Sequence, residues 1–338
     1  MANKMLRGGV FGFGGMGQEF ATRINFDRWY GDDVEIVGVC DRGEEKRRLA
    51  ESRFGLKAFE DPRELVNEGL DFALVTSTTV AHVEHGCLLA EAGVPMLMEK
   101  PIALTLEDAQ QMLDAVDTHG VGTVVNFQKR FAPEYQKLRQ VVQDGEVGDP
   151  ISMEASMYRG HGFYAAGARH RAVVEPEESG GWIVHHACHA VDIACWILGE
   201  VESVSTITRS TVAGGDSEEI VMGRLLFKRG AVASIFDTTG GVRAQHVAIA
   251  GVEGGAAISD AGAVPLLHLR LPGDRETGVP RIVDPRQTHP YVDPIKNLLD
   301  VVRGEGESLV TVHDAFYALK VTLAMRESAK RDGELVEV

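Results

Sequence analysis

Residues 179–199 carry side chains of types that move protons or bind polar substrates. The segment reads SGGWIVHHACHAVDIACWILG and holds His185, His189 and Asp192 among apolar residues. If it forms a helix, each residue turns by about 100°, so these three side chains lie within about 60° of one another. A neutral imidazole accepts a proton near neutral pH, and a neighbouring carboxylate can orient it or bind substrate. The alternative interpretation is a buried helix whose polar groups are satisfied by their neighbours.

A glycine-rich turn near residue 12 is a second candidate site. Its G-x-G-x-x-G pattern follows an apolar stretch predicted as a strand and opens a stretch predicted as a helix. The glycines permit a tight turn, close approach of the backbone to a pyrophosphate, and close packing of helix on strand. The residues expected to bind the dinucleotide here are Gly12, Phe13, Gly14, Gly15, Met16 and Gly17.

Asp41 follows the second predicted strand. A carboxylate at this place accepts hydrogen bonds from both ribose hydroxyls of adenosine and repels a 2′-phosphate, so we expect NAD as the cofactor. Arg42, next in sequence, can pair with that phosphate, which leaves NADP open as the less favoured alternative.

Lys100 is the third candidate, in the tripeptide Glu99-Lys100-Pro101 after predicted strand 94–99. Its ammonium group can hydrogen-bond a substrate oxygen. The alternative is a solvated surface charge. Pro101 restricts the residues before it to extended backbone.

Alternating strands and helices position these groups in the first part of the chain. The strands are expected at 8–13, 34–40, 71–77, 94–99 and 121–127, and the helices at 15–26, 43–53, 80–92 and 105–118. Such alternation predicts a doubly wound parallel sheet whose strands all end at one ligand-binding edge. We assign residues 1–125 to this nucleotide-binding domain.

The pattern changes over residues 126–338, which we assign to a second, α+β domain for substrate binding and oligomerisation. Many of its strand candidates alternate polar and apolar residues, which is typical of an antiparallel sheet with one covered face. These strands are expected at 151–158, 204–210, 219–227, 231–239 and 246–251, with a last helix at 313–330. Residues 159–178 are expected to form a long loop, a type of segment that is often functional.

Taken together, these motifs resemble the glucose–fructose oxidoreductase/inositol dehydrogenase (Gfo/Idh/MocA) family. The resemblance rests on GFGGMG at 12–17, Asp41, the loop at 76–82, EKP at 99–101, NFQKRFAPEY at 126–135 and GG-x7-His-x2-Asp at 180–192. It implies a Rossmann domain followed by a domain with a large, mostly antiparallel, open-faced sheet. It also implies cofactor contacts from Ser77, Thr78, His82, Glu99 and Lys100.

The resemblance implies a dehydrogenase in which Lys100 and His189 act on a secondary alcohol. His189 would take the hydroxyl proton while Lys100 hydrogen-bonds the same oxygen. The chain departs from the family pattern at His185, where Asp or Asn is usual, and at Thr78, where Pro is often found, whereas His82 keeps the family histidine. A second imidazole at His185 would disfavour a cation at His189 and keep it a neutral base, so we also count His185 as catalytic.

The expected substrate is a sugar, polyol, inositol or related cyclic alcohol. Its candidate contacts are Lys100, Arg130, Arg159, Tyr164, His185, His189 and Asp192. Alternative interpretations are a glycosidase that uses NAD through transient oxidation, a cofactor-binding regulator, or a metal site at His185, His186 and His189. The family chemistry needs no metal, and we expect none.

Composition restricts the remaining possibilities. The 338 residues have a net charge of −16, which disfavours nucleic acid and anionic membranes as partners. The four cysteines are scattered, and no apolar run is long enough to span a membrane, so we expect a cytoplasmic protein. An uncovered sheet face in the second domain predicts a homodimer or homotetramer.

Overall fold

The computed structural model describes residues 4–160, 176–210, 218–260, 265–271, 281–283 and 293–338. The chain divides into two compact units, described separately below. The first comprises Met1–Phe127 and Asp293–Phe316, and the second Gln128–Val292 and Tyr317–Val338. The first unit therefore takes in residues 293–316, which the sequence analysis assigned to the second domain. In the described part of the chain, no helix is both long and apolar enough to cross a membrane.

The first unit is built on a six-stranded sheet in the order β3-β2-β1-β4-β5-β6, and every pairing in it is parallel. The predicted α/β fold with a parallel sheet is confirmed. The strands are β1 (Leu6–Phe11), β2 (Val34–Cys40), β3 (Lys57–Phe59), β4 (Phe72–Val75), β5 (Met96–Met98) and β6 (Thr123–Val125). Strands β1 and β4 are almost wholly buried, as expected where helices cover both faces.

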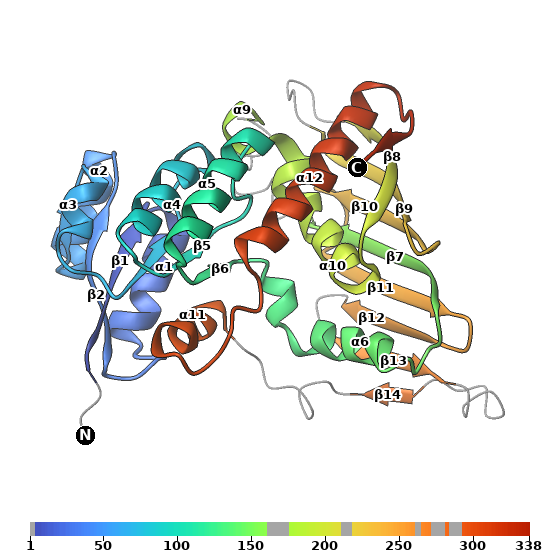
Figure 1. The fold of residues 1–338 in the computed structure, drawn as a ribbon, viewed down its shortest axis with the longest axis horizontal. Coiled ribbons are helices and arrows are strands. Elements are labelled where there is room, and N and C mark those ends of the chain that lie inside the picture. Colours follow the sequence, from blue (N-terminus) through green and yellow to red (C-terminus); the bar gives the residue numbers. More distant parts are fainter. Residues whose placement is uncertain (1–3, 161–175, 211–217, 261–264, 272–280, 284–292) are drawn as a thin grey trace. The chain divides into compact units, whose positions relative to one another are not determined.

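Helices lie on both sides of this sheet (Figure 1). They are α1 (Gly15–Ala21) with the π-helix η1 (Thr22–Phe26), α2 (Glu44–Leu49) with η2 (Ala50–Phe54), α3 (Pro62–Val66), the 3-10 turn η3 (Thr79–Ala81), α4 (His82–Glu91), α5 (Leu106–His119) and α11 (Pro294–Arg303). Local capping sets several of their starts. Thr105 accepts the Asp108 N–H at the start of α5, and Asp293 accepts the Ile295 N–H at the start of α11. Helix α11 packs on β4, β5 and β6 although it follows them by more than 160 residues.

The second unit contains a nine-stranded sheet in the order β14-β13-β12-β11-β7-β10-β9-β8-β15. All neighbours are antiparallel except β7 and β10, which run parallel. The predicted large, mostly antiparallel sheet is confirmed. Its strands are β7 (Pro150–Tyr158), β8 (Val201–Arg209), β9 (Ile220–Phe227), β10 (Val232–Thr238), β11 (Ala244–Gly251), β12 (Gly255–Asp260), β13 (Leu266–Arg270), β14 (Arg281–Val283) and β15 (Val336–Glu337).

Helices cover one side of this sheet (Figure 1). They are α6 (Pro133–Gln143), α10 (Cys188–Leu198) and α12 (Val312–Lys330), which the division between the units crosses, with the short turns η4 (Gln128–Phe131) and α9 (Pro176–Ser179). Strand residues facing them, such as Val221 and Leu225, join one apolar core with these helices. Residues of the opposite side are exposed, among them Met222 at 50% and Ile207 at 47%. This alternation gives the sheet one covered and one open face.

The segment predicted as one helix over 179–199 is not a regular α-helix. Gly180 and Gly181 have positive φ angles of 86° and 75°, and Ile183–Ala187 form a π-helix, η5, before α10 begins at Cys188. A π-helix has more residues per turn than an α-helix. The 100° spacing holds for His189 and Asp192, which both lie on α10, but does not apply to His185 in η5. That His185 shares a face with them stays a prediction. Helix α10 ends at Gly199, as predicted.

Candidate active site

The glycine-rich turn joins β1 to α1 as the sequence predicts. Gly12 has φ 95°, and a Cβ added there would lie 2.4 Å from the backbone of Ser77. A Cβ on Gly17 would lie 2.3 Å from the carbonyl oxygen of Gly12. Glycine is therefore required at both positions, because this turn and the loop after β4 approach one another at backbone distance. Gly14 and Gly15, by contrast, border open space.

The side chains of the turn differ in their surroundings. Phe13 is fully buried and packs edge-on against Phe54 at 5.0 Å, while Met16 is 38% exposed. Because its side chain is buried, Phe13 presents only its backbone to the open side of the turn. Its N–H donates to Oδ2 of Asp41 at 2.7 Å.

Asp41 links the ends of two neighbouring strands. While Oδ2 accepts the N–H of Phe13, Oδ1 accepts the N–H of Gly43 at 2.8 Å. The carboxylate is thus held in one orientation by two backbone donors. Arg42 beside it is exposed. Asp41 has the place and the fixed orientation expected of a ribose acceptor.

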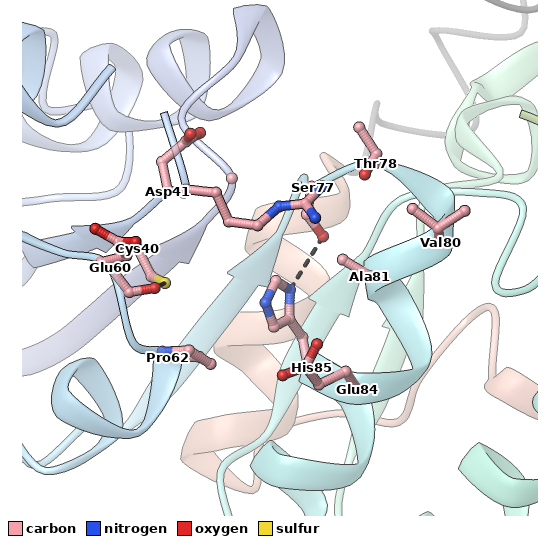
Figure 2. A pocket seen from close by; sticks show the side chains of 12 residues that line it. Cys40, Asp41, Glu60, Pro62, Ser77, Thr78, Val80, Ala81, Glu84 and His85 are labelled. Atoms are coloured by element: carbon pink, nitrogen blue, oxygen red, sulfur yellow. Dashed lines mark hydrogen bonds between the residues drawn. The ribbon is translucent and has the colours of Figure 1, made fainter. Parts of the chain in front are cut away.

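A hollow of about 390 Å³ opens at this edge of the sheet (Figure 2). We call it the cofactor hollow. It is lined by Gly12, Cys40, Asp41, Arg42, Glu60, Pro62, Ser77, Thr78, Val80, Ala81, Glu84 and His85. It lies where ligands bind in open α/β sheets, beyond the carboxyl ends of the strands. The structure thus brings together Gly12, Asp41, Arg42, Ser77 and Thr78 from the predicted set.

His85 lines the cofactor hollow and was missed by the sequence analysis. Its Nδ1 is 3.1 Å from the Ser77 hydroxyl oxygen, an interaction drawn in Figure 2. Burial and the nearby Arg42 cation lower the pKa of His85 to about 4, so the ring is neutral at pH 7. A signal existed in the sequence, because His85 stands three residues after His82 and so shares a helix face with it.

His82 lies elsewhere. It is 1% exposed and is not among the residues that line the cofactor hollow. Its Nδ1 is 2.8 Å from the carbonyl oxygen of Pro101, and its Nε2 is 3.1 Å from that of Ser77. Burial lowers the pKa of His82 to about 4. The ring therefore ties the loop after β4 to the turn after β5.

Glu99 and Lys100 follow β5 at the same edge of the sheet, and the Lys100–Pro101 peptide is cis. The Glu99 N–H donates to the Val75 carbonyl at 2.9 Å, which extends the pairing with β4. Oε1 of Glu99 accepts the side-chain N–H of Asn126 at 2.6 Å. Burial raises the pKa of Glu99, while the Lys100 cation and the Asn126 hydrogen bond oppose that rise. Asn126 was not a predicted site residue, because its link to Glu99 joins β5 and β6 across the sheet.

In the second unit, Arg130 and Asp192 form a buried ion pair. Nε of Arg130 is 3.0 Å from both carboxylate oxygens of Asp192, and a terminal nitrogen is 2.6 Å from Oδ1. The side chains are 4% and 1% exposed. Trp196 lies beside the guanidinium, 5.3 Å from it. Both residues were expected to bind substrate, and the structure pairs them with each other between η4 and α10.

His189 and His186 lie together in the same unit. His189 is 4% exposed, and its ring meets that of His186 edge-on at 5.7 Å. His186 stacks on Trp182 and contacts Asp237 and Arg159 through Nδ1. His185 is more exposed than either histidine. Asp237 was not predicted, although a carboxylate inside the apolar strand AVASIFDTT was a visible signal.

Lys129, next to Arg130 in sequence and predicted with it to lie near the substrate, is a further buried cation. Its Nζ is 3.3 Å from the Tyr135 hydroxyl and bonds to Oε1 of Gln245. Burial, together with repulsion from the nearby Arg159, lowers the pKa of Lys129 to about 7.

Tyr164, expected to bind substrate, lies outside the described residues. Among the residues that are described, no group of three His, Cys, Asp or Glu side chains could hold a metal ion.

Two family models match the chain. One, described as "Oxidoreductase family, NAD-binding Rossmann fold" (GFO_IDH_MocA), matches residues 6–127, and the "GFO/IDH/MocA C-terminal domain" matches residues 135–257. The two matches include the glycine-rich turn, Asp41, Lys100 and His189.

Curated relatives are similar over much of the chain. Myo-inositol 2-dehydrogenase of Thermotoga maritima is 25% identical over 98% of this chain and 99% of its own length. D-apiose dehydrogenase of Paraburkholderia graminis is 30% identical over 69% of this chain, a match that spans only 60% of that relative.

Solved structures share the fold. The WlbA dehydrogenase from Bordetella pertussis, in complex with NADH and UDP-GlcNAcA, has a TM-score of 0.84 at 24% identity and covers 100% of this chain and 99% of its own. Levoglucosan dehydrogenase, in complex with NADH and levoglucosan, has a TM-score of 0.86 at 20% identity and covers 98% of this chain and 99% of its own.

Proposed function

The chain belongs to the Gfo/Idh/MocA oxidoreductase family, as its motifs predict, and from this premise we propose that it is an NAD-dependent dehydrogenase of a secondary alcohol in a sugar, polyol or inositol. The observation that carries the proposal is the cofactor hollow. Gly12, Asp41 and Ser77 converge there from three strand ends of the parallel sheet, and Lys100 follows a fourth strand at the same edge.

The residues present fit a dinucleotide. Gly14 and Gly15 border open space, so a ligand can approach the backbone of the turn there, while the missing side chain at Gly12 lets the turn lie close to the Ser77 backbone. We propose that the turn at 12–17 holds the pyrophosphate, that Asp41 accepts the ribose hydroxyls, and that Ser77, Thr78 and His85 line the adenosine end. When bound, the nicotinamide supplies the hydride acceptor.

NAD is favoured over NADP in this proposal. A 2′-phosphate would lie near the Asp41 carboxylate, which two backbone N–H groups hold in place. Arg42 is the only cation among the residues that line the described hollow, so it is the residue that would offset this repulsion. A neutral His85 adds no positive charge there at pH 7.

Lys100 is proposed to hydrogen-bond the alcohol oxygen and to stabilise negative charge that develops on it. The Glu99–Asn126 hydrogen bond and the pairing of Glu99 with Val75 fix the backbone from which Lys100 projects. His82 supports the other side of this turn by its contact with the Pro101 carbonyl. The proposed contribution of Glu99 and His82 to cofactor binding is therefore to hold the loops in place.

His189 is proposed to accept the hydroxyl proton. The ring, which is 4% exposed, must be uncharged to do so. His185 is proposed as the neighbouring imidazole that opposes a second positive charge and contacts substrate. Arg159 is proposed as a further substrate contact, while the Arg130–Asp192 pair anchors η4 to α10 beneath them.

A substrate screen tests this proposal. Purified protein is incubated with NAD or NADP and a panel of sugars, inositols and sugar acids, and the absorbance of the reduced cofactor is followed. We expect turnover with at least one cyclic polyol and with NAD in preference to NADP. Release of an aglycone from nitrophenyl glycosides without net NADH would instead indicate the glycosidase mechanism.

The protein is also proposed to form a homodimer or homotetramer through the open face of the nine-stranded sheet. Apolar side chains from several strands lie on that face, including Ile207, Met222 and Val232. Contiguous exposed apolar surface of this kind marks association in soluble proteins.

A further inference from the structure

His186, which packs against His189, has no role in the function proposed above. Its side chain is nevertheless buried and makes several close contacts. It is 5% exposed. Its ring stacks on the indole of Trp182, with centroids 4.3 Å apart and planes 9° from parallel. The same ring meets His189 edge-on at 5.7 Å and 68°. His189 therefore packs against a ring that is itself fixed by stacking.

Two charged side chains meet at Nδ1 of His186. Nε and a terminal nitrogen of Arg159 are 3.1 Å and 3.0 Å from it. Oδ2 of Asp237 is 3.2 Å from the same nitrogen. The other carboxylate oxygen, Oδ1, accepts the indole N–H of Trp182 at 2.8 Å, and Asp237 is fully buried.

The two partners make opposite demands on Nδ1, because Oδ2 of Asp237 can only accept a hydrogen bond whereas the two closer nitrogens of Arg159 can only donate one. A guanidinium group is always charged and can only donate hydrogen bonds, so the nitrogen that faces it must accept. In a neutral ring, a proton on Nδ1 would set an N–H donor against the Arg159 N–H groups 3.0–3.1 Å away. A ring protonated on both nitrogens would in addition place a second cation beside Arg159, at high electrostatic cost. The Trp182 indole already satisfies one oxygen of Asp237, and the Asp237 charge offsets that of Arg159.

We propose that Arg159 and Asp237 hold His186 as a neutral imidazole with its proton on Nε2, and that this ring is the positioning residue for His189. The inference rests on the proposed function, because that function assigns proton transfer to His189. A neutral, immobile ring fixes the orientation of His189 and adds no positive charge that would depend on pH near neutrality.

The charged groups near His186 and His189 are Arg159 after β7, Asp237 on β10 and Lys129 on η4. Further charges act on these cations: Glu134 on α6 and Asp260 on β12 act on Lys129, and Arg243 before β11 acts on Arg159. Arg159 already acts on Lys129. Burial is the largest cause of the lowered pKa of Lys129, which is about 7, and repulsion from Arg159 is the second largest. The negative charge of Asp237 opposes the same shift. Asp237 and Arg159 thus set opposing fields, and removal of either one changes the protonation of the histidines in a defined direction.

The first test reads the proton position and does not depend on activity. The full chain is labelled with ¹⁵N-histidine, and His186→Gln identifies the His186 signals by their disappearance. At pH 7 we expect an unprotonated Nδ1 and a protonated Nε2. In Arg159→Met, Asp237 faces the ring alone, and we expect His186 to become protonated on both nitrogens. A protonated Nδ1 in the wild-type protein would overturn the proposal.

The second test reads the effect on His189. The acidic limb of kcat/KM against pH, measured for alcohol oxidation, reports the pKa of the base. Asp237→Asn keeps an oxygen for the Trp182 indole but removes a negative charge, so the limb should move to lower pH by about 0.5 unit or more. Glu202→Gln, which removes an exposed charge on β8, serves as the matched control and should leave the limb in place.

The two tests also separate this inference from the proposed function. An unmoved limb in Asp237→Asn, with turnover reduced, would mean that Asp237 and His186 only support the fold. If His189→Asn kept full turnover, the proposed function would fail, while the ¹⁵N signals would still report whether His186 is held neutral by Arg159.

Discussion

The Asp41 carboxylate accepts the backbone N–H of Phe13 at 2.7 Å, which joins the end of β2 to the glycine-rich turn after β1. One side chain thereby orders the turn proposed for the pyrophosphate and presents the acceptor proposed for the ribose. In this proposal, Asp41 therefore affects both the affinity for the cofactor and the preference for NAD over NADP.

Replacement of Asp41 should therefore change cofactor preference. Asp41→Ser removes the negative charge while it keeps a short hydrogen-bonding side chain. We expect kcat/KM with NAD to fall by about tenfold to 100-fold, because the charge-assisted hydrogen bonds to ribose are lost. Because the repulsion is also removed and Arg42 remains, activity with NADP should fall less or rise. Steady-state kinetics with both cofactors measure the ratio, and Asp33→Ser in the same unit is the control.

The Arg130–Asp192 pair should be important for stability. Its side chains are 4% and 1% exposed, so loss of Arg130 removes three charge-assisted contacts from a buried carboxylate. Arg130→Met is expected to lower the free energy of unfolding by about 3–5 kcal/mol. The double variant Arg130→Met with Asp192→Leu removes both charges and should recover a large part of that loss. Urea unfolding at pH 7 gives both values, and additive effects of the two single changes would show that the residues do not act as a pair.

His82 should make the protein less stable in mild acid. Its pKa is lowered to about 4 in the folded protein, whereas an unfolded histidine titrates near 6.5. Between these values the unfolded chain binds more protons, so stability is lost as the pH falls from about 6.5 towards 4.

Between pH 7 and pH 5, the titration of His82 is expected to lower the free energy of unfolding by about 2 kcal/mol. His82→Gln keeps a donor for one of the two carbonyls but cannot titrate, so its unfolding free energy should change less with pH over this interval. Urea midpoints at pH 5 and pH 7 measure the difference between the two proteins. His313→Gln, at an exposed histidine of the same unit, should behave as wild type.

The open sheet face gives a prediction about assembly. Met222 and Ile207 lie opposite one another on β9 and β8, and both are about half exposed. If this face joins subunits, Met222→Glu should convert the oligomer to monomers, because it would bury a charge in an apolar contact. Light scattering coupled to size-exclusion chromatography reports the mass. Val242→Glu, at an exposed residue outside the regular strands, is the control, and an unchanged mass for Met222→Glu would exclude this face as the interface.

Features set by residues close in sequence could be predicted. The turn at Gly12 needs only its neighbours and the strand before it, and the strand from Val34 to Cys40 is predicted at its observed bounds. The alternation in β9, with Val221 inward and Met222 outward, likewise predicts a sheet with one covered face.

Features that depend on partners far apart in the sequence could not be predicted. Arg130 and Asp192 are 62 residues apart and His186 and Asp237 are 51 apart, so no local pattern indicates either pairing. Helix α11 packs on the first sheet only because the chain returns to it after the second, a path that composition does not reveal. The π-helix at Ile183–Ala187 could not be predicted either, because periodicity arguments assume a regular α-helical turn.

The most direct test of the proposed dehydrogenase compares Lys100→Met and His189→Asn with the wild-type protein. The controls are Lys137→Met and His268→Asn in the second unit. For the alcohol found in the screen, each site variant should lower kcat by about 10²–10⁴-fold, since a proton acceptor or an oxyanion-stabilising donor is lost. Titration should show that NAD still binds with nearly unchanged Kd. Turnover within tenfold of wild type in either site variant would contradict the proposed roles.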